Sequence, residues 1–278
     1  MKKFILAGIF ILTFIFLFSC SISKVTITKP APKILETDIT EMHGEVENAE
    51  RLDLFVEQVN KNVKDKVRLV RYTIEGDPIF QILDYNGEKL ILTIDTSHDQ
   101  YGQGGKTKYE CKGIKKTETD VETQYFLTGC PNNEIGNLLA ISYDTEKEDY
   151  FGFRLKFGKT KKHEINTKEQ SVTMALPNGD YKVVKDFQLS RLEMNQIYKY
   201  MLFSNYLGEK KFSSNCGDSS EKPYELTVWI NDATREFNWK ECDKSKDGKK
   251  MTKLANEIIT ILKKNPVYKE LLQDFSGI

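Results

Sequence analysis

Short apolar runs separated by turn residues recur along the chain, a pattern that predicts strands, tight hairpins and a few amphipathic helices. In 48–63, apolar residues recur at helical spacing behind Asn48, a residue type favoured at helix N-caps, which predicts a helix. The Asn86-Gly87 pair predicts a tight hairpin. Strands of the first half are expected at 67–74, 79–85, 90–94, 138–142 and 150–157.

The second half repeats an order of two strands and one helix. A hairpin turning at Asn178-Gly179 comes first, and Ser190-x-x-Glu193 then forms a capping box that opens a helix. Two alternating apolar strands follow within 224–239, and a final amphipathic helix is expected over 249–264. The order ββα-ββα predicts helices packed on one face of an antiparallel sheet.

These elements predict an α+β fold class with two small domains, each an antiparallel sheet packed with one or two helices, behind an N-terminal lipoprotein signal peptide. Gly158–Gln170 is polar without an apolar face, so the boundary between the domains is expected there. The expected divisions are 1–19 for the signal peptide, 20–40 for the lipidated N-terminus and spacer, 41–157 for the first domain, 158–170 for the linker and 171–278 for the second domain.

The N-terminal segment has the features of a secretory signal peptide. Lys2 and Lys3 precede the uncharged run Phe4–Ser19, which is shorter than the roughly 20 residues that cross a bilayer as a helix. Leu17-Phe18-Ser19-Cys20 resembles a bacterial lipobox, from which Phe18 departs because a small or β-branched residue is usual there.

A lipobox predicts a diacylglyceryl thioether on Cys20 and cleavage just before it, so that two acyl chains would hold the protein on a membrane. Pro30 and Pro32 lie in an aperiodic segment that predicts an extended spacer. The expected location is therefore the cell membrane, with the protein lipid-anchored and facing outside the cytoplasm. The alternatives are an uncleaved membrane anchor and plain secretion.

The chain has five cysteines, and an even number remains once Cys20 is set aside for lipid. Outside the cytoplasm this favours disulfides, for which three pairings are possible. A hairpin turning midway between Cys111 and Cys130 would place them opposite each other within bonding reach. The predicted pairs are Cys111–Cys130 and Cys216–Cys242. The alternative, a metal site of four thiolates, is not supported by any Cys-x-x-Cys spacing.

A distinctive series of motifs lies in the first half. They are His43-Gly44-Glu45, Asn48-x-Glu50-Arg51, Tyr72-Thr73-x-Glu75-Gly76-Asp77-Pro78, Tyr85-Asn86-Gly87 and Ser97-His98-Asp99-x-Tyr101-Gly102, with the cysteines at 111 and 130. Over about residues 38–157 this series resembles an uncharacterised family of lipoproteins from Gram-positive, spore-forming bacteria, domain of unknown function 4362. The resemblance implies a surface-anchored protein and no established activity.

The segment 95–111 holds the densest group of candidate ligand residues: Asp95, His98, Asp99 and Tyr101. A histidine beside carboxylates could serve acid–base chemistry, and the neighbouring glycines could let backbone amides approach an anion. The simpler interpretation is a polar loop between strands.

Other candidates have equally simple structural interpretations. His43 could share a metal with His98, but a surface histidine explains it as well, and His163 is expected in solvent among the lysines of the linker. Trp229 and Trp239 could form an aromatic platform for sugar or peptide, although one of them is expected in the core.

The leading hypothesis is a membrane-anchored extracytoplasmic lipoprotein that acts as a binding or interaction module, without catalysis or cofactor. Its expected partners are the membrane, through lipid on Cys20, and a protein or cell-wall ligand. With 41 basic and 41 acidic residues, the chain gives no electrostatic reason to expect nucleic acid. The alternatives are a cell-envelope hydrolase using His98 and Asp99, and an inhibitor or immunity protein for a secreted enzyme.

Overall fold

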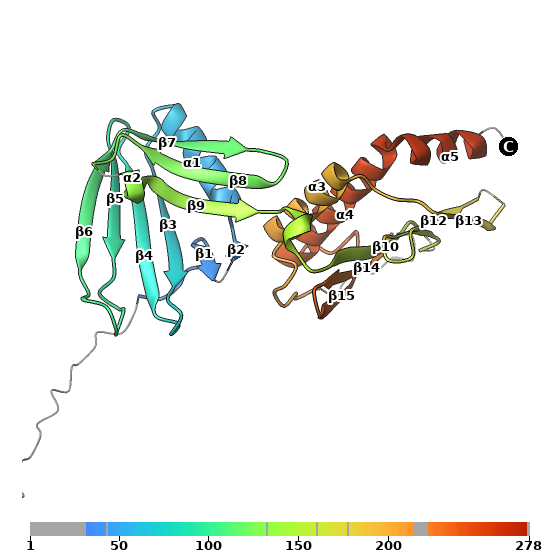
Figure 1. Ribbon diagram of the computed structural model, residues 1–278, viewed down its shortest axis with the longest axis horizontal. Coiled ribbons are helices and arrows are strands. Elements are labelled where there is room, and N and C mark those ends of the chain that lie inside the picture. The colour runs from blue at the N-terminus through green and yellow to red at the C-terminus, as the bar shows by residue number, and fades with distance from the viewer. Residues whose placement is uncertain are drawn as a thin grey trace, which may run out of the picture. The chain divides into compact units, whose positions relative to one another are not determined.

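A computed structural model describes residues 32–42, 44–131, 133–159, 161–176, 178–213 and 222–276. Within these ranges the strands form two six-stranded sheets and one three-stranded sheet, with helices packed against them (Figure 1). Lys33–Ile278 forms one compact unit. The α+β fold class predicted from the sequence is confirmed.

The first core lies between helix α1 (Glu50–Asn60), the first six-stranded sheet and the three-stranded sheet. The first sheet has the order β2 (Glu45–Glu47), β1 (Ile39–Met42), β3 (Asp65–Tyr72), β4 (Pro78–Tyr85), β5 (Leu90–Asp95) and β6 (Lys106–Cys111). The three-stranded sheet consists of β7 (Gly113–Glu118), β8 (Glu122–Thr128) and β9 (Asn137–Ser142), and the short helix α2 (Asn133–Gly136) precedes β9. Helix α1 contacts β3 and β7 and buries Leu52, Phe55 and Val59.

The chain reaches this core through a strand in the segment predicted to be spacer. Ile39 and Thr40, expected in the spacer, begin β1, which pairs in parallel with β3. Arg68 holds the entry point, because its guanidinium donates to Asp38 (Nε to Oδ1, 3.0 Å) and to the carbonyl of Lys33 (2.8 Å). The parallel pair departs from the expected all-antiparallel arrangement, since α1 carries the chain across between β1 and β3.

Asn48 has a different role from the helix cap predicted for it. Its backbone is left-handed (φ 56°), and its side chain donates to the carbonyls of Glu36 and Asp38. Ala49 is the N-cap residue of α1 and provides no side-chain hydrogen bond. Asn48 therefore fixes the segment before β1, and the helix is shorter than predicted.

The first arm of the predicted cysteine hairpin divides at Lys112 between two sheets. Cys111 ends β6, which pairs with β5, whereas Gly113 begins β7, which pairs with β8. The hairpin register is the predicted one, and Cys111 is bonded to Cys130 with the Cα atoms 4.2 Å apart. The Cys111–Cys130 prediction is confirmed, and the bond joins the last residue of one sheet to the end of the hairpin in the other.

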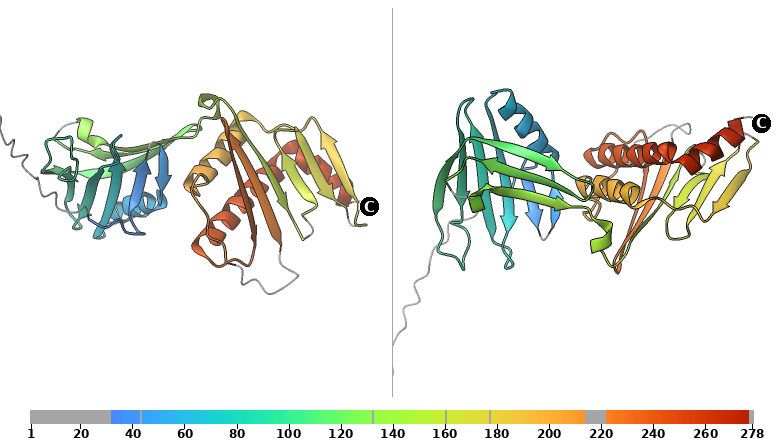
Figure 2. Two further views of the ribbon diagram at one scale, coloured as in Figure 1. Left: turned by 90° about the horizontal axis from the view of Figure 1, so that it is seen from below. Right: turned by 45° about the horizontal axis from the view of Figure 1, so that its top comes forward.

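The second six-stranded sheet is antiparallel throughout and carries its helices on one face (Figures 1 and 2). Its order is β13 (Tyr181–Lys185), β12 (Ser171–Ala175), β11 (His163–Asn166), β10 (Phe151–Phe157), β14 (Pro223–Ile230) and β15 (Ala233–Lys240). The helices are α3 (Arg191–Phe203), α4 (Lys246–Lys264) and α5 (Pro266–Ser276), and the 3-10 turn η1 (Thr145–Lys147) precedes β10.

Two segments lie in this sheet rather than where the sequence pattern placed them. The strand expected at the end of the first domain, β10, pairs with β14, and β11 lies within the expected linker 158–170. Alternating apolar residues in β10 fit either sheet, so the pattern alone could not choose its partner. In β11 only Ile165 supplies an apolar side chain to the core. The sequence of β11 therefore lacks the alternation of apolar and polar residues that would predict a strand.

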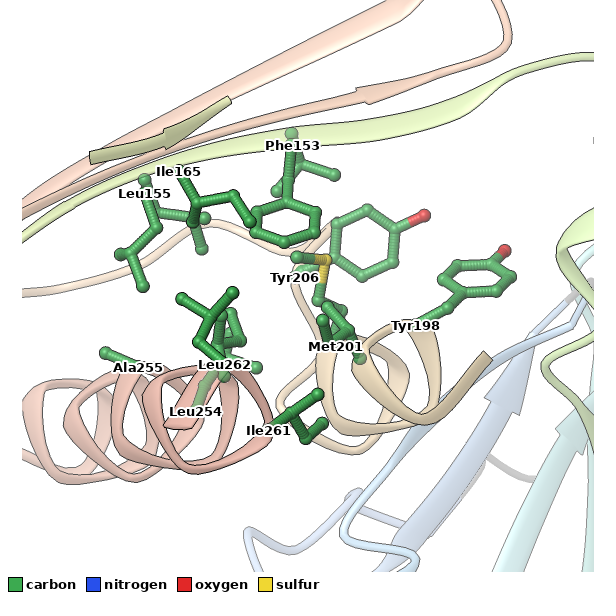
Figure 3. Close-up of a cluster of buried hydrophobic side chains, with 14 of the residues drawn as sticks. Phe153, Leu155, Ile165, Tyr198, Met201, Tyr206, Leu254, Ala255, Ile261 and Leu262 are labelled. Atoms are coloured by element: carbon green, nitrogen blue, oxygen red, sulfur yellow. The ribbon is translucent and has the colours of Figure 1, made fainter. Parts of the chain in front are cut away.

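The second core fills the space between the sheet and its helices. Figure 3 shows side chains of α3 and α4, including Met201 and Leu262, directed toward Phe153 and Leu155 of β10. The predicted capping box opens α3, with Ser190 accepting from the Glu193 amide and Glu193 accepting from the Ser190 amide. Leu202 of α3 packs against both cores.

Removing the Cys111–Cys130 bridge should lower the free energy of unfolding by about 2–4 kcal/mol, because the unfolded chain regains the freedom of a long loop. Urea unfolding followed by circular dichroism measures this loss. Cys111→Ala and Cys130→Ala should each lose the whole bridge, so the double variant should add little to either single loss. Additive losses would contradict a bridge as the common cause.

Candidate functional site

The predicted ligand loop between β5 and β6 uses its carboxylates to hold its own shape. Asp95 is buried, accepts a hydrogen bond from the Ser97 amide (3.1 Å) and pairs with Lys106 (2.9 Å). Burial alone would raise the pKa of Asp95, but the bonds from Lys106 and Ser97 outweigh burial and hold the pKa below its usual value.

The tip of this loop is a turn built around Asp99. Its carboxylate accepts from the amides of Tyr101 (3.0 Å) and Gly102 (2.8 Å), and a Cβ at position 102 would meet that carboxylate at 2.4 Å. His98 instead lies edge-on to the Phe80 ring, with centroids 6.0 Å apart. Tyr101 is 78% exposed. Among the described residues no hydrogen bond joins His98 to Asp99.

The other two histidine candidates are His43 and His163. His43 lies outside the described residues. His163, expected in solvent, stacks on Phe157 with ring centroids 5.2 Å apart, and burial lowers its pKa. Across the described ranges, no three side chains of histidine, cysteine, aspartate or glutamate are grouped so that they could hold a metal.

The two tryptophans lie in different surroundings, one in the core and one against a lysine side chain. Trp239 belongs to the core, where it stacks on Tyr224 (5.2 Å between centroids) and donates through Nε1 to Thr252. Trp229 lies on the other face of the sheet, under the Lys168 ammonium at 5.2 Å from the ring centroid. The expectation that one tryptophan is a core residue agrees with this arrangement.

Two predicted covalent sites fall outside the described part of the chain. Cys20, the expected lipid attachment point, and Cys216 both lie among the residues that the structure does not describe. Cys242, the predicted partner of Cys216, is disulfide-bonded. In the described residues no helix has the combined length and apolarity needed to cross a bilayer.

A cleft of about 440 Å³ lies between α1, β7, α3 and α4, at a place that the sequence analysis did not indicate. Its volume falls in the range of small-molecule binding sites. The lining combines lysines and carboxylates with a few apolar and aromatic side chains. These residues are Glu50, Asp53, Lys116, Lys199, Tyr200, Phe203, Ser204, Lys249, Lys250, Lys253, Leu254 and Glu257.

An ion-pair chain crosses the cleft wall from α3 to α1. Lys199 of α3 pairs with Glu118 of β7, Glu118 also pairs with Lys116 (3.4 Å), and Lys116 pairs with Asp53 of α1 (2.8 Å). Asp53 in turn accepts from the buried Tyr125 hydroxyl at 2.7 Å.

These ion pairs shift the pKa values of Glu118 and Lys116. The hydrogen bond from Lys199 outweighs burial and lowers the pKa of Glu118. Burial alone would lower the pKa of Lys116, but Asp53 and Glu118 outweigh burial and raise it. Each group is therefore held in its charged form at neutral pH.

Helix α4 supplies the opposite wall with three lysines, of which one forms an ion pair with a described carboxylate and two do not. Lys250 pairs with Glu50 at 3.2 Å. Lys249 and Lys253 line the cleft and are exposed, and no carboxylate of the described residues forms an ion pair with either. Their spacing along α4 is visible in the sequence, but Lys116 and Lys199 come from distant segments, so only the folded chain shows the group.

Comparison with known proteins identifies part of this architecture. The protein belongs to the α+β fold class. Its residues 36–126 match the family described as Domain of unknown function (DUF4362). The match confirms the family resemblance for the segment from the start of the first sheet into β8. No curated protein and no solved structure matches the chain.

Glu118→Gln should lower the free energy of unfolding at pH 7 by less than about 1 kcal/mol, because the side chain is partly exposed and solvent weakens its ion pairs. Since the pKa of Glu118 is lowered from 4.5, the wild-type advantage should be present above that pH. It should disappear as the pH falls through the lowered folded-state pKa.

Urea unfolding at a series of pH values measures this difference, with Glu88→Gln at an exposed turn as the control. A difference between Glu118→Gln and wild type that stays constant from neutral to acidic pH would contradict the ion-pair explanation.

Proposed function

We propose that the protein is a lipid-anchored, extracytoplasmic binding protein whose binding site is the cleft between α1, β7, α3 and α4. The observation that carries the binding role is the cleft itself, a cavity of ligand size with charged and aromatic groups converging on it. In contrast, the His98 and Asp99 loop uses its carboxylates for its own turn.

The anchor is supported by the sequence of the N-terminal segment. A basic start, a short apolar run and Leu17-Phe18-Ser19-Cys20 together favour lipid on Cys20. The Cys111–Cys130 bridge and the disulfide-bonded state of Cys242 are consistent with an oxidising compartment outside the cytoplasm.

The folded body also supports a tethered arrangement. Arg68 binds both Asp38 and the Lys33 carbonyl, so the point where the chain enters the first sheet is held by side-chain contacts. Lipid on Cys20 would therefore be joined to a fixed position on the body through the segment 21–32.

Cells fed labelled palmitate should incorporate the label into the parent chain and fail to incorporate it into Cys20→Ala, because the thiol is the proposed acceptor. Ser23→Ala, a matched change in the same segment, should be labelled like the parent. Membrane fractionation should place the parent and Ser23→Ala in the membrane. Equal labelling of Cys20→Ala would rule out the anchor.

The binding role is tested by recovering the full-length chain from cross-linked envelopes and identifying what accompanies it. A specific protein or cell-wall fragment should accompany the parent and Lys264→Glu, and it should be lost with Lys253→Glu. Lys253 lines the cleft, whereas the exposed Lys264 lies at the far end of the same helix and carries the same charge. Equal recovery with both variants would place the binding site elsewhere.

A further inference from the structure

The charges that line the cleft are unequal. Five lysines line the cleft with three carboxylates, and Glu118, paired with Lys116 and Lys199 in the wall, adds a fourth carboxylate. The lysines are Lys116, Lys199, Lys249, Lys250 and Lys253, and the lining carboxylates are Glu50, Asp53 and Glu257. The chain as a whole is balanced, with a formal net charge of +0, so the excess is a local property of this cavity. A concave surface with one excess sign of charge concentrates ligands of the opposite sign.

The excess comes from two lysines of α4, which share their helix face with one carboxylate of the lining, Glu257. Lys116 and Lys199 are engaged by Asp53 and Glu118 on the far wall, and Lys250 is engaged by Glu50. Lys249 and Lys253 are four residues apart on α4, so they lie on the same helix face, and no described carboxylate pairs with them. Two exposed ammonium groups without an ion-pair partner among the described residues thus belong to the lining of the cleft.

The rest of the lining is suited to an organic group. Phe203 is partly buried at the edge of the first core, and Leu254 is buried in the second core. Tyr200 adds a third apolar surface. Burial, and to a smaller extent the negative charge of Glu257, raise the pKa of the Tyr200 hydroxyl. The hydroxyl therefore stays protonated and can donate a hydrogen bond.

We propose that the cleft binds a small organic anion, with its carboxylate or phosphate between Lys249 and Lys253 and its apolar body against Phe203 and Tyr200. This inference rests on the proposed binding role and is independent of the lipid anchor. It follows from two features found together, the unpaired lysines and the apolar surface, since the former selects negative charge and the latter selects an organic group.

The test uses the full-length chain in nanodiscs of zwitterionic lipid and fluorine NMR of three probes, with empty nanodiscs as the baseline. The probes are 4-fluorophenyl phosphate, 4-fluorophenylacetate and the neutral 4-fluorobenzyl alcohol. Both anions should bind saturably at one site per chain, and the neutral probe should bind at least about tenfold more weakly, as two nearby positive charges imply. The stronger of the two anions identifies the head group as phosphate or carboxylate.

Matched variants separate the site from general charge. Lys249→Gln with Lys253→Gln should weaken anion binding about tenfold, whereas Lys263→Gln with Lys264→Gln removes two exposed lysines from the last turn of α4 and should leave binding unchanged. Urea unfolding of both pairs verifies that each remains folded.

Equal weakening by the two pairs, or equal binding of the neutral and anionic probes, would overturn the proposal. Failure of every probe to bind, while the envelope experiment still recovers a partner that Lys253→Glu loses, would overturn the organic-anion ligand and leave the binding role in place. Loss of palmitate labelling in Cys20→Ala bears only on the anchor.

Discussion

The attachment of α3 to the β7–β8 hairpin determines whether the cleft exists. Asn195 of α3 is 1% exposed; its amide nitrogen donates to the carbonyl of Asp120, in the hairpin turn, and its oxygen accepts from Thr145. One turn later, Lys199 pairs with Glu118 on the same hairpin. A buried amide that lost these partners would be left unsatisfied, so the contact is costly to open.

This attachment explains why charged groups can line the cleft without weakening the fold. Glu118 is shared by two lysines, and the carboxylate of Asp53 is shared by Lys116 and the Tyr125 hydroxyl. Charges that are neutralised and hydrogen-bonded in this way can be partly removed from water at acceptable cost. The pairs fix the walls, while the unpaired lysines of α4 remain available to a ligand.

Elements that depend on local patterns could be predicted from the sequence, whereas features that depend on distant partners could not. The capping box of α3 and the register of the cysteine hairpin are local, since neighbouring residues determine them. The partner of β10 and the strand β11 depend on pairing across the fold, and Asn48 satisfies distant carbonyls rather than its own helix. The candidate ligand residues of the loop between β5 and β6 could be seen as a cluster in the sequence. The cleft could not, because it is formed by four elements that lie far apart in the sequence.

The contact between Arg68 and the entering chain has a mechanical consequence for a protein held at one end. A pull transmitted along the chain to Lys33 reaches the guanidinium of Arg68 and the carboxylate of Asp38 before it reaches any strand. Arg68 is itself seated over the Phe80 ring, 5.1 Å from its centroid, on the neighbouring strand. If the protein is anchored through its N-terminal segment as proposed, force on that segment would be spread over β3 and β4 instead of peeling β1 from the edge of its partner, and the first core would keep its shape under load.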